Sequence, residues 1–165
     1  MYLYQALMHA ERGLDLPHSL RLAHKAGWLI GHSDESVKSR FRSWQYECLG
    51  LIKLRQGRVD QAISDLERAI AMRSDGLVDE GSGCYYLALA YTKKAQANPA
   101  DSAQWHARAR QRCLEARQAT IRGVLKQETT DLLEQLDMLE RISNGRPPES
   151  LPAARAADST APSPI

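Results

Sequence analysis

Cysteine and histidine side chains are the first candidates for chemistry in this sequence. It holds five histidines and three cysteines, Cys48, Cys84 and Cys113. Zinc sites draw several such ligands together, often from closely spaced pairs, but only His106, seven residues before Cys113, lies near a cysteine. The other ligands are not supplied, so we expect no metal site. The cysteines are odd in number and widely spaced, which is instead typical of buried thiols in a reducing compartment.

Other patterns that carry enzymatic chemistry are missing as well. The sequence has no glycine-rich phosphate loop, no G-x-S-x-G and no H-E-x-x-H. No pair of acidic residues lies in an apolar setting, and the histidines are scattered. We therefore expect neither an enzyme nor a bound cofactor.

Composition indicates one all-α domain. The 165 residues are rich in Ala, Leu, Gln and Arg, include a single Phe and lack alternating Val, Ile and Thr. A net charge of +2 favours neither a nucleic-acid nor a membrane partner. No apolar run approaches the roughly 20 residues that span a bilayer, and the N-terminus lacks the order of a secretory signal. These features predict a cytoplasmic protein.

The stretch from Ser43 to Ile70 reads as a helix, a turn and a second helix. One apolar stripe precedes Gly57 and another follows it, and the small residues Gly50 and Ala62 predict a close approach of the two backbones. The stretch resembles one tetratricopeptide repeat. The residues that carry the resemblance are Tyr46, Leu49, Gly50, Gly57, Ala62, Leu66 and Ala69, whereas Lys53 and Ser74 depart from the usual Tyr and Pro.

Two more hairpins are predicted around this one, over residues 2–30 and from Gly81 onward. Their second helices repeat the four-then-three spacing of Ala62, Leu66 and Ala69, as Ser19, Ala23 and Ala26 and as Ala109, Cys113 and Ala116. The central first helix is expected to be long, from Ser33-Asp34-Glu35 to Gln56, and Asp101 with Gln104 forms a plausible capping box after Pro99. Three tandem hairpins at a period of roughly forty residues are typical of helical repeat arrays.

The C-terminal part is predicted as an arginine-rich helix from Asp101 to about Gly123 and an acidic helix from Lys126 to Ser143, which we expect to pair with each other. A leucine-rich stripe on the last helix either caps the array or serves as a dimerisation helix. From Arg146 onward Pro, Ala and Ser dominate. We thus divide the chain into a repeat domain over 1–144 and a disordered tail over 145–165. The stripe comprises Leu125, Leu132, Leu133, Leu136, Leu139 and Ile142.

The resemblance implies a non-catalytic scaffold that binds a peptide or helix of a partner protein in a concave apolar groove. The lysines and asparagines with which some family members clamp a terminal carboxylate are absent. For Trp44 and Leu54, burial by neighbouring repeats is the open alternative. The register places ten residues in the groove, namely Trp44, Glu47, Leu51, Leu54, Arg55, Ser82, Tyr85, Leu89, Thr92 and Lys93.

A second hypothesis assigns the chain a structural role, as a homodimer, another self-assembly, or one piece of a longer superhelix. It rests on the first predicted helix, which begins almost at Met1 without a capping helix before it. Its outer residues Tyr2, Tyr4 and Met8 are therefore expected to be exposed.

Overall fold

The computed structural model describes residues 1–72, 81–119 and 123–143. Within these residues it contains no β-strand, as the composition predicted. None of the helices in these ranges combines the length and the apolar character needed to cross a bilayer. The predicted tail, 145–165, lies outside the described residues. The helices are α1 (Tyr2–Glu11), α2 (Leu16–Gly31), α3 (Glu35–Arg55), α4 (Val59–Ala71), α5 (Ser82–Ala97), α6 (Ser102–Gln118) and α7 (Gly123–Ser143), with a 3-10 helix at Pro99–Asp101.

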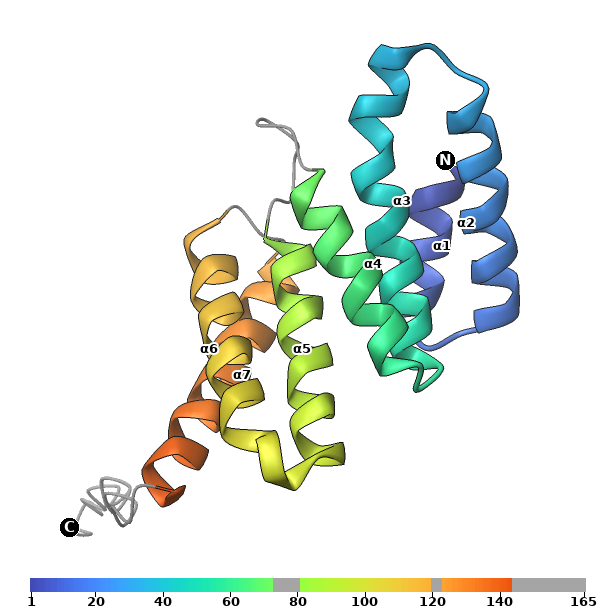
Figure 1. Ribbon diagram of the computed structural model, residues 1–165. Helices are drawn as coiled ribbons and strands as arrows, with labels where there is room; N and C mark the ends of the chain where they lie inside the picture. The colour runs from blue at the N-terminus through green and yellow to red at the C-terminus, as the bar shows by residue number, and fades with distance from the viewer. Residues whose placement is uncertain (73–80, 120–122, 144–165) are drawn as a thin grey trace, which may run out of the picture.

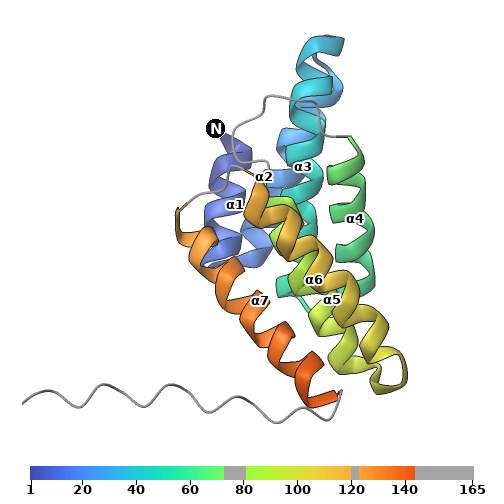
Figure 2. The same ribbon diagram turned by 90° about the vertical axis from the view of Figure 1, so that its left-hand side faces the viewer.

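The helices follow one another as antiparallel neighbours (Figure 1). The pairs α1 and α2, α3 and α4, and α5 and α6 each run in opposite directions, and each helix packs against the next one along the chain. The odd-numbered helices also contact one another in the order α1, α3, α5 and α7. The view turned by 90° shows α7 running along one side of α5 and α6 (Figure 2). One apolar core therefore runs through all seven helices of the described residues.

Glycine closes the first helix of the first two pairs. Gly13 has φ +66° and Gly57 has φ +76°, which is the left-handed conformation that glycine adopts without steric cost. After Gly13, the side chain of Asp15 accepts a hydrogen bond from the backbone N–H of His18 at 3.0 Å, and Pro17 lies in the first turn of α2. The expected turns at both glycines are confirmed.

Small residues set how closely the paired helices pack. A Cβ atom at Gly50 would lie only 2.5 Å from Leu66 Cγ and 3.3 Å from the carbonyl oxygen of Ala62. The predicted close approach of α3 and α4 is therefore present. The four-then-three spacing also marks the buried face of each second helix. Its nine members are all buried, namely Ser19, Ala23, Ala26, Ala62, Leu66, Ala69, Ala109, Cys113 and Ala116.

Two predicted helix starts have different outcomes. The central helix is long as expected, since α3 spans 21 residues. The capping box after Pro99 is wrong, because Asp101 makes no side-chain hydrogen bond to the start of α6. Pro99–Asp101 forms a 3-10 turn and Asp101 has φ −106° and ψ 9°. That backbone is not the extended conformation from which an N-cap side chain reaches the first N–H groups.

The last helix covers the end of the third pair with part of its leucine stripe. Four leucines of α7 belong to the buried core, whereas the side chains of Leu139 and Ile142 are exposed. The expected pairing of basic and acidic helices is present, since Arg110 Nε lies 2.6 Å from Asp137 Oδ1 and 3.7 Å from Glu140 Oε2. The buried four are Leu125, Leu132, Leu133 and Leu136.

Candidate binding surface

The structure places half of the ten predicted groove residues in the interior. Only 1% of Leu51 and 2% of Leu54 is exposed, so these two leucines serve the packing of α3 against its neighbours. These buried side chains do not form the floor of an open groove in this structure. For Leu54, burial was the alternative left open by the sequence. The five are Glu47, Leu51, Leu54, Ser82 and Tyr85.

The buried polar members of this set hold helices together. The Ser82 hydroxyl donates a hydrogen bond to the Glu47 carboxylate, and so joins α5 to α3. Tyr85 lies against the core, and burial together with the nearby Glu128 raises its pKa above the ordinary value. A buried carboxylate with a hydroxyl donor is stabilised by that bond. The contacts therefore indicate structural roles for these side chains.

The other five predicted residues reach the surface. Trp44, Leu89 and Thr92 are half-buried, and Arg55 and Lys93 are exposed. Trp44 stacks on Phe41 at a centroid distance of 6.4 Å, and Thr92 donates to the carbonyl of Ala88 at 2.9 Å. Arg55 Nη2 donates to the backbone carbonyl of Glu11, also at 2.9 Å. Three of the five thus have partners within the chain.

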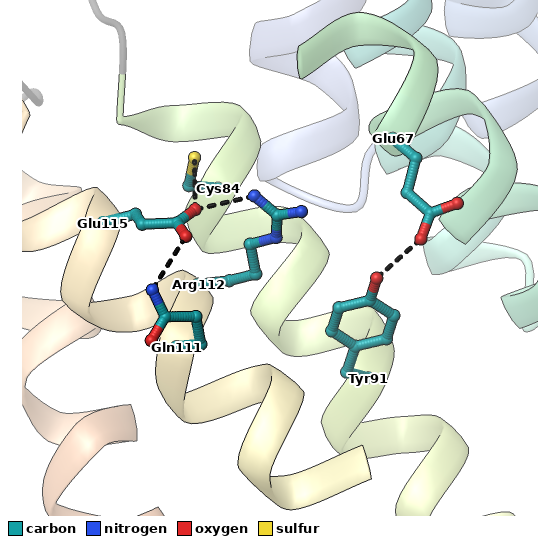
Figure 3. Close-up of polar contacts among 6 residues, drawn as sticks. All are labelled: Glu67, Cys84, Tyr91, Gln111, Arg112 and Glu115. Carbon is teal, nitrogen blue, oxygen red and sulfur yellow. Dashed lines mark hydrogen bonds and ion pairs between the residues drawn. The ribbon is translucent and has the colours of Figure 1, made fainter. Parts of the chain in front are cut away.

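The three cysteines are all buried, and the surroundings of Cys113 do not activate its thiol. Cys113 is buried, and burial raises the pKa of its thiol to about 12, so it is protonated at neutral pH. Cys84 Sγ lies 4.0 Å from Glu115 Oε2, which also accepts a hydrogen bond from Arg112 at 2.7 Å, and Glu115 Oε1 accepts one from Gln111 at 3.0 Å (Figure 3). This cluster links α5 to α6. No group of side chains in the described ranges could hold a metal ion.

A surface that the sequence analysis did not single out lies on the outer side of α2. Directly opposite its buried face, α2 and the residue after it present six exposed side chains at helical spacing. Trp28 is 63% exposed and Leu29 is 41% exposed. We call this set the α2 face, and its members are Arg21, His24, Lys25, Trp28, Leu29 and His32.

The α2 face is basic and partly ordered by its own contacts. No Asp or Glu occurs between residues 16 and 31. The rings of Trp28 and His32 lie 4.3 Å apart, and His32 Nδ1 lies 2.7 Å from the carbonyl oxygen of Trp28. Lys25 Nζ lies 4.6 Å from the centre of the Tyr2 ring. The face thus presents an arginine and an indole ring held by its neighbour, two residue types that are enriched at protein interfaces.

The signal for this face was present in the sequence. Arg21, His24, Lys25 and Trp28 have the spacing of one helix face, and they alternate with the small residues Ser19, Ala23 and Ala26 that predicted burial. The groove register of the family selects residues on the first helix of a pair. It therefore does not include the outer side of the second helix.

Comparison with known proteins identifies no relative. No protein-family model matches the chain, and neither a curated protein nor a solved structure matches it.

Proposed function

We propose that this chain is a non-catalytic protein–protein interaction module built from three tetratricopeptide-like hairpins and a C-terminal capping helix. The burial of the repeated small residues in all three second helices supports this architecture, as does the close approach at Gly50. Stacked hairpins of this kind present extended surfaces and rarely supply convergent catalytic groups.

The α2 face is the binding surface that the geometry favours, and the exposure of Trp28 is the observation that carries this choice. Trp28, 63% exposed, and Leu29, 41% exposed, are adjacent and form an apolar patch with a basic rim, which is typical of an interaction site. The flanking cations Arg21 and Lys25 select an acidic partner. We infer that the partner is an amphipathic helix with acidic residues and apolar anchors.

Part of the groove predicted from the sequence is also a candidate for contacts with a partner. Its surface members, Trp44, Arg55, Leu89, Thr92 and Lys93, stay candidates for contacts with the flank of a partner. The buried members are excluded from direct contact as long as the conformation is the one described here.

Affinity capture with matched variants tests the proposed surface. Immobilised wild-type protein, Trp28→Ala and Arg21→Glu would be compared with Arg117→Glu, which makes the same charge change at an exposed position of α6. We expect the two α2 variants to lose partners that wild type and Arg117→Glu retain, while circular dichroism shows all four folded. Equal capture by all four proteins contradicts the α2 face as the binding surface.

Self-assembly is the second candidate function, and one observation favours it. Large exposed apolar side chains are concentrated in the first hairpin and in α7, at the two ends of the molecule. Among the described residues only Met72 falls between them. Those at the ends are Met1, Tyr4, Leu14, Trp28 and Leu29, and Met138, Leu139 and Ile142.

A further inference from the structure

We propose that the α2 face binds α7 of a second copy of this chain, so that the molecules associate head to tail. The inference rests on the proposed function, because it takes the α2 face to be a binding surface and names its partner. It is argued from the charges, the exposure and the residue spacing of the two helices.

The outer face of α7 carries acidic and apolar side chains, which complement the basic and apolar side chains of the α2 face. Asp131 and Glu134 are exposed near its middle. In its second half Met138 is 55% exposed, Leu139 is 43% exposed and Ile142 is 58% exposed. The buried leucines on the opposite side hold α7 on the molecule. An acidic and apolar helix face is thus displayed on a fixed support.

The two faces also share one spacing. Counted from Arg21, the residues His24, Trp28, Leu29 and His32 lie three, seven, eight and eleven positions on, and Glu134, Met138, Leu139 and Ile142 lie at the same distances after Asp131. A parallel alignment of the helices therefore brings the residues at the centre of the two faces together, with Arg21 beside Asp131, Trp28 beside Met138 and His32 beside Ile142.

The alignment is specific in its direction. The parallel arrangement brings Arg21 and Lys25 to the part of α7 that carries Asp131 and Glu134. The antiparallel arrangement would bring Arg21 to the apolar end of α7 and Trp28 to its acidic end, which loses both the ionic and the apolar complementarity. Within each copy, the contacts that the described residues show for these side chains lie near the surface, among them Gln127 Nε2 donating to Asp131 at 2.7 Å.

The contact cannot form inside one molecule. The first hairpin and α7 lie at opposite ends (Figure 1), and no packing between α2 and α7 is present in the described residues. Each contact between two copies consequently leaves one α2 face and one α7 unused. Such heterologous contacts produce chains that either grow or close into rings.

Complementary blocking variants of the full chain test this arrangement by sedimentation velocity over a wide range of protein concentration. Trp28→Glu blocks the α2 face, and Met138→Glu blocks α7. We expect wild type to associate with rising concentration, and each variant alone to need about tenfold or more protein for the same association. An equimolar mixture of the two should form a one-to-one dimer that does not grow, because one native contact remains and the other would oppose two glutamates.

The control is Leu14→Glu, which places a charge at an exposed apolar residue outside both faces and should associate like wild type. Wild type that stays monomeric at every concentration overturns the inference, and so does a mixture that behaves like its separate components. The proposed function fails separately, when Trp28→Ala captures the same partners as wild type. If wild type is monomeric and its capture of partners depends on Trp28, the α2 face is a binding surface but its partner is not a second copy of this chain.

Discussion

At the scale of single residues, Gly50 is the position where the packing of α3 on α4 is most sensitive. The Cβ atom of an alanine there would meet Leu66 Cγ at 2.5 Å, closer than atoms in a packed core come. We expect Gly50→Ala to lower the free energy of unfolding by about 1 to 3 kcal/mol, although alanine favours the helix by about 0.5 to 1 kcal/mol.

Gly31→Ala is the matched control in a chemical denaturation experiment. Gly31 is the last residue of α2, and a Cβ atom there would meet nothing within 4 Å. Its substitution should leave stability unchanged or raise it slightly. If Gly50→Ala proves as stable as Gly31→Ala, the two helices are farther apart than the structure places them.

Tyr91 links stability to alkaline pH. Its hydroxyl donates to Glu67 at 2.6 Å, joining α5 to α4 (Figure 3), and burial followed by this bond raises its pKa to about 12. The unfolded chain ionises Tyr91 near its ordinary pKa of about 10, while the folded chain keeps the proton. Stability is therefore complete below about pH 10 and falls as pH rises through about 12.

Tyr91→Phe should separate the contribution of the hydrogen bond to Glu67 from that of Tyr91 ionisation. At about pH 8 the variant loses the hydrogen bond, worth about 1 kcal/mol. Between about pH 8 and about pH 11 its free energy of unfolding should decline less than that of wild type, because Tyr91 no longer ionises on unfolding. Equal declines in urea titrations at the two pH values would show that Tyr91 does not contribute to the alkaline loss.

Residue spacing predicted the core better than it predicted the surface. The nine residues at four-then-three spacing were recognisable because small side chains at fixed intervals are needed wherever two backbones meet closely. The burial of Glu47 and Ser82 was not recognisable, since each is polar and each finds its partner on another helix, 35 residues away in sequence. A hydrogen bond between distant segments leaves no local pattern.

At the scale of elements, α7 serves two surfaces along one helix. Its leucines continue at near-helical spacing from Leu125 to Ile142, so the sequence could not tell where the packing ends. In the structure the packing of this stripe ends after Leu136, and the side chains of Leu139 and Ile142 are exposed. The buried side of α7 thus covers the third helix pair, and the contact proposed above uses its exposed side, from Asp131 to Ile142.

A pair of substitutions measures this division. Leu136 is 2% exposed, and Leu136→Ala should destabilise the fold by about 2 to 5 kcal/mol because it leaves a cavity. Ile142 is 58% exposed, and Ile142→Ala should change stability by less than about 0.5 kcal/mol. Thermal and urea unfolding at low protein concentration would detect the difference. Similar losses for both would mean that the whole length of α7 is packed.

At the scale of the whole molecule, side-chain contacts connect hairpins that are not neighbours in sequence. The Tyr86 hydroxyl of α5 donates to the carboxylate of Glu11 at the end of α1, and Arg55 of α3 donates to the carbonyl of the same residue. Repeat arrays held only by neighbouring contacts can unfold from one end. The bonds at Glu11 instead tie the first, second and third helix pairs at one point.

We therefore expect the three pairs to unfold together. Trp28 lies in the first pair and Trp105 in the third, so variants that keep one of these tryptophans, with the others changed to Phe, report the two ends separately by fluorescence. At a protein concentration too low for assembly, both variants should show the same urea midpoint, since coincident probes indicate a two-state transition. Tyr86→Phe, added to each, should lower both midpoints together because it removes the buried hydroxyl that donates to the Glu11 carboxylate. Midpoints that differ between the two ends before this change would show that the hairpins unfold one after another, and that the contacts at Glu11 are too weak to couple them.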